Sequence, residues 1–121
     1  MHVKTYKDLI VWQKAMDLTV EIYRLVKFLP REETYALSDQ MRRAVVSIPS
    51  NIAEGYGRNS TRDYVKFLKT ARGSCFELET QIQACVRIKY FTEENAKISF
   101  SFLDEIIKML NALIKKLSDN F

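Results

Sequence analysis

The segment from residue 40 to residue 58, QMRRAVVSIPSNIAEGYGR, divides its side chains between two separate faces. Its apolar residues recur at intervals of four, three and four, at Met41, Val45, Ile48 and Ile52. Its polar residues recur along another side, at Gln40, Arg43, Ser47, Asn51, Glu54 and Arg58. This spacing predicts an amphipathic α-helix over residues 38–57. Pro49 lacks a backbone N–H, so we expect a bend there, and we expect Gly55 and Gly57 to end the helix.

The polar face of this segment is built from short hydrogen-bonding side chains, whereas a solvated helix face is usually rich in Lys and Glu. One interpretation is that these small residues only allow close helix packing beside the proline. The other is that Ser47, Asn51 and Glu54 form a hydrogen-bond network between helices or between subunits. The sequence leaves both interpretations open.

Three further amphipathic segments predict helices over residues 8–29, 61–89 and 93–117. The first has a seam at Leu9, Trp12, Met16, Thr19, Tyr23 and Val26, and a second stripe at Leu18, Ile22, Leu25 and Leu29. The next has a seam at Tyr64, Leu68, Ala71, Cys75, Leu78, Ile82 and Cys85. The last has a seam at Ile98, Phe102, Ile106, Met109, Leu113 and either Lys116 or Leu117, widened by Leu103, Leu110 and Ile114.

Short connections between four such helices predict an all-α, antiparallel, up-and-down four-helix bundle that forms one domain over residues 1–121. The wide apolar arc of the first helix is compatible with a deeply buried helix. It is equally compatible with an arc that partly contacts another subunit.

The net charge of +4 is concentrated in the middle of the chain. Residues 40–72 contain seven basic and two acidic side chains, whereas the rest contains twelve and thirteen. The basic residues are Arg42, Arg43, Arg58, Arg62, Lys66, Lys69 and Arg72. Such a local surplus predicts contacts with nucleic-acid phosphates, the alternative being an ordinary solvated face. Gly73 continues the stripe and suggests close approach of a backbone or ligand, and Tyr56 and Tyr64 are candidates for base stacking.

Residue types needed for catalysis are scarce. The only histidine is His2, and Glu77 and Glu79 are two residues apart, so they point to different faces of a helix. Neither a zinc-binding Cys/His spacing nor a phosphate-binding glycine loop is present. We therefore expect a protein that is not an enzyme and that has no cofactor and no metal.

The two cysteines, Cys75 and Cys85, lie ten residues apart on one predicted helix. That spacing is roughly 15 Å, too far for a disulfide, and predicts buried free thiols in a reducing compartment. No apolar run is long enough to span a membrane, and the first residues do not match a signal peptide. We expect a cytoplasmic protein without a membrane partner.

The motif of residues 37–58 resembles the signature of the four-helix-bundle proteins encoded within 23S rRNA intervening sequences. The matching residues are Leu37, Gln40, Arg42, Arg43, Ala44, Ser47, Ile48, Asn51, Ile52, Ala53, Glu54, Gly55 and Arg58. Further matches are Leu9, Val11, Trp12, Ala15, Phe28, Leu29, Pro30, Glu33, Ala71, Gly73, Ser74, Glu77, Leu78 and Glu79, so the resemblance covers nearly the whole chain. One departure is Tyr35-Ala36, where a glycine is common before Leu37.

This resemblance implies a four-helix bundle that assembles into a ring-like homopentamer. It also marks the family-motif or interface positions Gln40, Ser47, Asn51, Glu54, Gly55 and Gly73. A related branch comprises the Avd-like accessory proteins of diversity-generating retroelements, in which the ring partners a reverse transcriptase.

Together, the basic surplus and the resemblance predict a non-enzymatic, oligomeric, nucleic-acid-binding protein. RNA is favoured over DNA because the family occurs within ribosomal RNA genes. One alternative is a protein-interaction scaffold for a reverse transcriptase, and another is a passenger protein without a host role. Neighbouring genes would discriminate between the RNA-binding protein and the scaffold. A neighbouring reverse transcriptase gene favours the scaffold, whereas an enclosing rRNA gene favours the RNA-binding protein.

Overall fold

The computed structural model describes residues 3–119, and four α-helices make up most of that range. They are α1 (Ile10–Leu25), α2 (Leu37–Tyr56), α3 (Thr61–Ile88) and α4 (Glu93–Ser118). Short 3-10 helices cover residues 6–8, 26–28 and 31–33. Residues 3–119 contain no β-strand, so the prediction of an all-α fold with four helices is confirmed.

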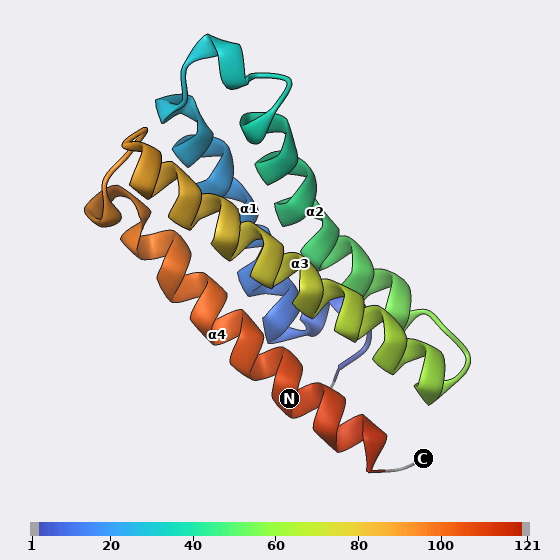
Figure 1. Cartoon of the computed structure of the whole chain (residues 1–121). Coiled ribbons are helices and arrows are strands. Elements are labelled where there is room, and N and C mark those ends of the chain that lie inside the picture. Colours follow the sequence, from blue (N-terminus) through green and yellow to red (C-terminus); the bar gives the residue numbers. More distant parts are fainter. Residues whose placement is uncertain (1–2, 120–121) are drawn as a thin grey trace.

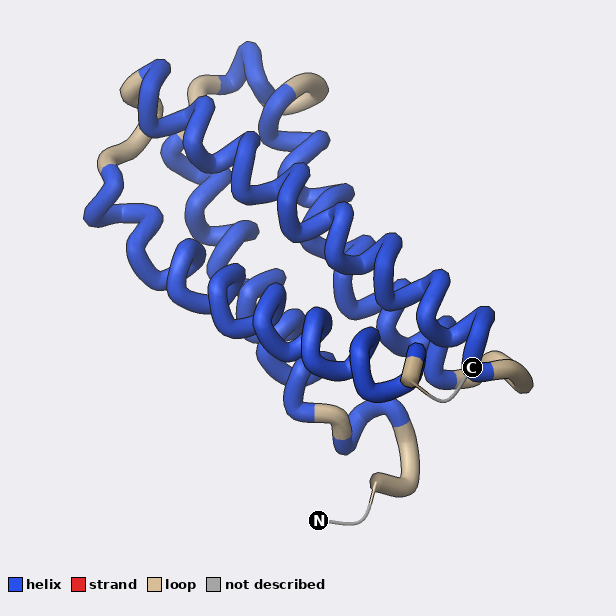
Figure 2. The backbone as a smooth tube through the Cα atoms, turned by 60° about the horizontal axis from the view of Figure 1, so that its bottom comes forward, coloured by secondary structure: helices blue, strands red, loops and turns tan. Residues whose placement is uncertain are grey.

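Successive helices run in opposite directions and lie side by side (Figure 1). α1 also packs against α4, which completes a helical bundle, and the contact between α2 and α3 is the most extensive. The tube view shows the same arrangement, with the connections confined to the two ends (Figure 2). The start of α3 therefore lies near the ends of α2 and α4, far from the connection between α1 and α2.

The core is lined by one apolar face of each helix. The predicted seam of α2 is confirmed, because Met41, Val45, Ile48 and Ile52 are all fully buried. The seam of α3 is confirmed from Leu68 to Cys85, while Tyr64 at its start is half-buried. None of the helices within residues 3–119 has the length and apolar content that crossing a lipid bilayer requires.

The predicted seam of α1 is wrong at its centre, although Leu9 and Trp12 at its start pack against the core and Val26 at its end is buried. Met16 and Tyr23 are 41% and 45% exposed. The buried side of α1 is instead the second predicted stripe, which includes Leu18, Ile22 and Leu25. Val11 and Ala15 extend this stripe toward the start of the helix. The buried stripe has only apolar side chains, whereas the predicted seam contains the Tyr23 hydroxyl, which is costly to bury without a partner.

The seam of α4 is displaced in the same way. Ile98 is 52% exposed, whereas Leu103, Leu110 and Ile114, predicted to widen the seam, are buried. Ile106 is the one predicted seam residue of α4 that is fully buried. In both helices the apolar arc is wider than the core can cover, so packing against the neighbouring helices selects which part is buried.

The helix ends follow local chemistry. α1 ends at Leu25 rather than at residue 29, because the chain tightens into a 3-10 helix and becomes extended before Pro30. Gly55 does not end α2 but lies within it, buried, and Gly57 caps it in a right-handed conformation. α3 begins after Ser60, whose hydroxyl accepts a hydrogen bond from the Asp63 N–H at 3.1 Å. It ends at Ile88, and the capping residue Lys89 is left-handed, with a φ of 74°.

Candidate nucleic-acid interface

The outward face of α3 presents basic side chains in a row. Arg62, Lys66 and Lys69 follow the capped first turn at spacings of four and three, which places them on one side of the helix, and all three are exposed. With Val65 and Thr70 they line a shallow groove with a volume of about 540 Å3. Because the opposite side of α3 is anchored in the core, this row is held on a rigid support.

The ammonium groups of Lys66 and Lys69 have no hydrogen-bond or ion-pair partner within residues 3–119. Within α3, the only carboxylate between residues 61 and 76 is Asp63, which belongs to the capping turn. Asp63 lies three residues before Lys66 but forms no ion pair with it within residues 3–119, so both ammonium groups remain available for an external anion. These two lysines are the centre of the candidate site.

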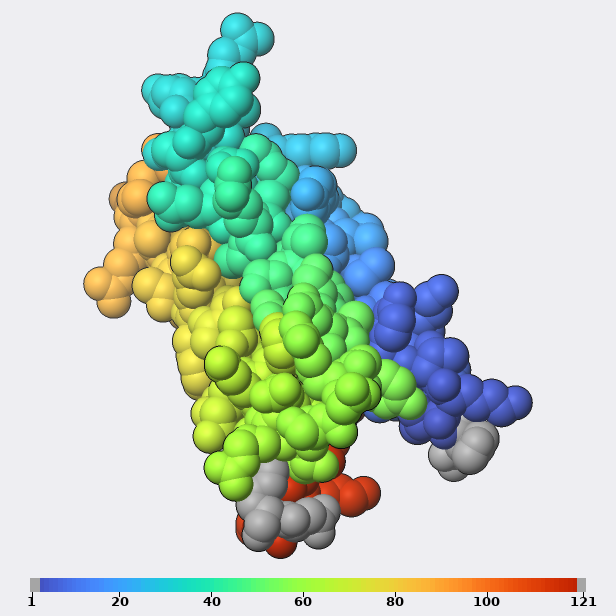
Figure 3. All heavy atoms as spheres, turned by 90° about the vertical axis from the view of Figure 1, so that its right-hand side faces the viewer, coloured from blue at the N-terminus to red at the C-terminus, as the bar shows by residue number. Residues whose placement is uncertain are grey.

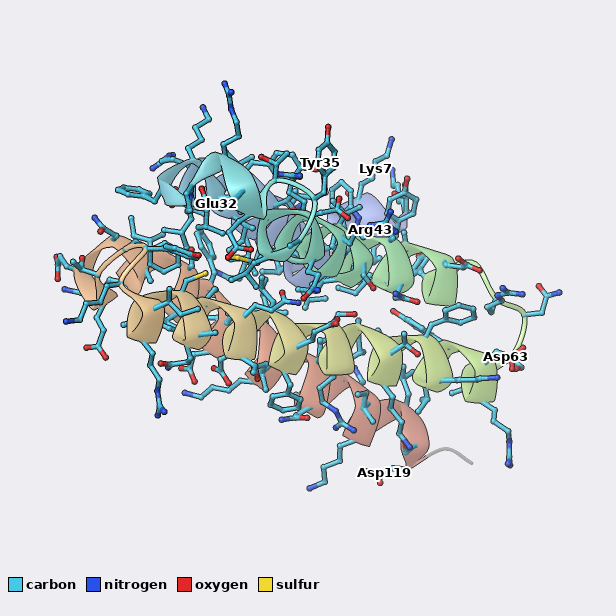
Figure 4. The ribbon with its side chains drawn as sticks, turned by 45° about the horizontal axis from the view of Figure 1, so that its top comes forward. Lys7, Glu32, Tyr35, Arg43, Asp63 and Asp119 are labelled. Carbon is cyan, nitrogen blue, oxygen red and sulfur yellow. The ribbon has the colours of Figure 1, made fainter. Side chains whose placement is uncertain are left out.

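Four other basic residues from the predicted set are engaged within the chain. Arg42 donates to the carbonyl oxygen of Thr34 at 3.1 Å, and Arg43 pairs with Asp39 at 2.9 Å. Both arginines lie in the first half of α2, at the far end of the bundle from Lys66 and Lys69. The side-chain view shows Arg43 well separated from Asp63 at the start of α3 (Figure 4).

Arg58 and Arg72 lie closer to the row. Arg58 pairs with Glu54 at 2.8 Å and stacks over the ring of Phe67, with its guanidinium carbon 4.7 Å from the ring centroid. Arg72 donates to the side-chain oxygen of Asn111 in α4 at 2.9 Å. The structure thus brings Arg62, Lys66, Lys69 and Arg72 together on α3, places Arg58 beside them, and separates Arg42 and Arg43 from them.

Two residues of the polar face of α2, Ser47 and Asn51, form a hydrogen-bond network that reaches α3. The hydroxyls of Ser47 and Ser74 are 2.8 Å apart and join α2 to α3. The Asn51 amide donates to the Ser47 carbonyl oxygen at 2.8 Å and to the Ser47 hydroxyl at 3.0 Å. Glu54 instead forms its surface pair with Arg58, and Gln40 is exposed. Figure 3 views this side, with the atoms of α2 lying directly against those of α3.

The two glycines of the predicted motif have opposite surroundings. A Cβ at Gly55 would lie 2.8 Å from the Cβ of Phe67 and 3.2 Å from the carbonyl oxygen of Tyr64. Gly55 therefore permits the close approach of α2 and α3. A Cβ at Gly73 would meet nothing within 4 Å, so the close approach expected there is absent within the described chain.

Aromatic side chains near the row fall into two groups. Tyr56 and Tyr64 pack edge to face with ring centroids 6.1 Å apart, and burial raises the pKa of Tyr64 to about 12. The edge of one ring therefore covers one face of the other, and that face cannot stack on a base. Phe76, which the sequence did not single out, is 49% exposed and lies on the same face as Lys69 and Gly73. The signal that could have found it is its position seven residues after Lys69.

The cysteines are confirmed as buried free thiols. Burial raises the pKa of Cys75 to about 12 and that of Cys85 to about 11. Both thiols therefore stay protonated near neutral pH and are poor nucleophiles. Within residues 3–119, no three His, Cys, Asp or Glu side chains are grouped so that they could hold a metal ion.

Comparisons with known proteins agree on the fold. A family model described as 23S rRNA-intervening sequence protein matches residues 7–112. The crystal structure of a protein of unknown function from the S23 ribosomal protein family of Bacteroides thetaiotaomicron VPI-5482 superposes with a TM-score of 0.81. It is 31% identical in sequence, over 88% of this chain and 99% of that chain. Among curated proteins, none matches the chain.

Proposed function

The chain belongs to the 23S rRNA-intervening sequence protein family, and from that premise we propose that it is a non-enzymatic, cytoplasmic, oligomeric protein that binds RNA. The observation that supports RNA binding best is the exposed row on α3, centred on Lys66 and Lys69. Those two ammonium groups have no partner within residues 3–119. A solvated helix face usually alternates charges, whereas this row does not.

The end of α4 adds further positive charge to the same region. The Arg72–Asn111 hydrogen bond fixes α4 beside α3 at this level. Lys115 lies one helical turn beyond Asn111 and is exposed, so it extends the basic surface from α3 onto α4. A surface of lysines on two rigid helices suits phosphate contacts, which fix position but carry little sequence information. We therefore expect weak sequence specificity.

Self-association is supported by a different observation. Met16, Val20 and Tyr23 recur along α1 at spacings of four and three and are 41%, 64% and 45% exposed. Val46 of α2 is 40% exposed and lines a shallow hollow together with Tyr23. An apolar strip that crosses two helices is typical of a protein–protein contact. We propose that it joins copies of the chain in the ring-like homopentamer that the family resemblance implies.

Replacing Val20 by Glu is expected to weaken this assembly. The side chain is largely exposed in the single chain, so the bundle should fold normally, whereas an interface would have to bury an unpaired carboxylate. We expect the dissociation constant of the oligomer to rise at least about tenfold. Light scattering after size-exclusion chromatography over a dilution series measures it. Ile98→Glu, at a similarly exposed aliphatic residue of α4, is the control, and an unchanged mass for Val20→Glu would contradict the assignment.

The salt dependence of binding tests the proposed function. Protein of known oligomeric mass is titrated with structured RNA, single-stranded DNA and duplex DNA across a salt series. Each phosphate contact contributes about −0.9 to the log–log slope for duplex DNA and about −0.7 for single strands. We expect measurable binding with a steep slope and tighter binding to RNA. An intact oligomer that binds none of the three near physiological salt would contradict the proposal and favour a scaffold for a protein partner such as a reverse transcriptase.

A further inference from the structure

Phe76 is an exposed aromatic ring on the basic face of α3. Its side chain is 49% exposed although it lies in the middle of the longest helix. Within residues 3–119 the ring makes no close contact with another aromatic ring, unlike Phe28, which packs against Phe91, or Tyr56, which packs against Tyr64. An exposed phenyl ring has an unfavourable contact with water, so it gains from being covered.

The surroundings of Phe76 leave room for a planar group. Gly73 lies one turn before it on the same face, and a Cβ at Gly73 would meet nothing within 4 Å. Lys69 lies one further turn back, seven residues or roughly 10 Å from Phe76 along the helix axis. The open surface at Gly73 thus separates an exposed ammonium group from an exposed ring.

The charged residues of α3 differ on the two sides of Phe76 along the helix. Toward the start of α3 lie Lys69, Lys66 and Arg62, whereas Glu77 and Glu79 follow Phe76 on either side of the face. A polyanion is therefore attracted toward the start of α3 and repelled beyond Phe76. Phe76 marks the end of the attractive surface.

From this juxtaposition we propose that the outward face of α3 binds single-stranded nucleic acid. Lys66 and Lys69 contact successive phosphates, and an unpaired base covers Gly73 and stacks on Phe76. A positively charged track beside an exposed aromatic ring is the usual arrangement for binding single strands, because every base has a π-face. In a duplex the base faces are already stacked and cannot reach the ring. The inference rests on the proposed function and deepens it.

The test compares Phe76→Ala with Phe76→Trp and the unchanged protein. The probes are single-stranded RNA, a single strand of DNA with the same sequence, an equally long strand whose central nucleotides are abasic, and a duplex. We expect Phe76→Ala to lose about fivefold to a hundredfold in affinity for the base-containing strand. The affinity of Phe76→Ala for the abasic strand and for the duplex should stay unchanged, as should its salt slope. Phe76→Trp should bind the base-containing strand as tightly as the unchanged protein does. The tighter of the two base-containing strands identifies RNA or DNA as the ligand.

Tyr35→Ala is the matched control, because Tyr35 is 94% exposed and projects away from the helices (Figure 4). It lies in the connection before α2, at the other end of the bundle from the start of α3. Equal losses for Phe76→Ala on base-containing strand and duplex would overturn the stacking proposal. Unchanged binding by Phe76→Ala would also overturn it, and an altered oligomeric mass of that variant would then assign the ring to assembly. Failure of the unchanged protein to bind any probe would instead contradict the proposed function itself.

Discussion

Replacing both Lys66 and Lys69 by Glu is expected to lower the affinity for single-stranded RNA on the order of tenfold to hundredfold. Two phosphate contacts are lost, and two carboxylates are placed where the phosphates would lie. The log–log salt slope should become shallower by about 1.4. Both side chains are exposed and form no ion pair within residues 3–119, so the substitution breaks no contact that holds the bundle together. Fluorescence anisotropy across a salt series, with circular dichroism to verify folding, measures the effect.

The control for this variant is Arg31→Glu with Lys97→Glu. Both residues are exposed and lie at the other end of the bundle, in the connection before α2 and in the first turns of α4. This double variant lowers the net charge by the same amount, so it removes the general attraction of a basic protein for a polyanion without touching α3. Equal losses for the two variants would show that net charge alone drives binding. An unchanged affinity for the Lys66/Lys69 variant would remove α3 as the binding surface.

The sequence predicted α2 best because its side chains leave little choice of orientation. Only one stripe of α2 is continuously apolar, and it is the stripe that is buried. α1 and α4 have apolar arcs wider than the core, so periodicity alone could not tell Leu18 from Met16 or Leu103 from Ile98. The choice depends on how the neighbouring helices pack, which is a property of the whole bundle rather than of a local window.

The basic residues show a second limit of sequence-based prediction. Their closeness in the chain suggested one surface, but the turn at residues 57–60 reverses the chain, so the first half of α2 and the first half of α3 lie at different ends. The ion pairs of Arg43 and Arg58 could have been predicted from the sequence. Asp39 precedes Arg43 by four residues and Glu54 precedes Arg58 by four, and such spacings favour ion pairs on one helix face. Neither Lys66 nor Lys69 has an acid four residues before it, and Asp63, three residues before Lys66, forms no ion pair with it within residues 3–119.

Replacing Gly55 by Ala is expected to destabilise the protein, whereas replacing Gly73 by Ala is expected to stabilise it. Both glycines lie inside α-helices, where Ala is favoured by about 1 kcal/mol. At Gly73 nothing opposes that gain, since the new Cβ meets nothing within 4 Å. At Gly55 the new Cβ would lie 2.8 Å from the Cβ of Phe67 and 3.0 Å from the ring of Tyr64. A Cβ atom and the nearby Tyr64 carbonyl move only with the backbone, so α3 must shift, at a cost of about 1–3 kcal/mol.

The two glycine variants control for each other, because the helix preference favours Ala at both positions and most of it cancels in their difference. Urea unfolding at one fixed protein concentration, with circular dichroism as the signal, should therefore separate the variants by about 1–3 kcal/mol, most of which is the steric cost. A displaced α3 would also lengthen the Ser47–Ser74 contact, now 2.8 Å, so the loss at Gly55 should shrink when Ser74→Ala is already present. Equal stabilisation by both substitutions would mean that α2 and α3 do not approach as closely as Gly55 permits. The polar network between them would then need a different explanation.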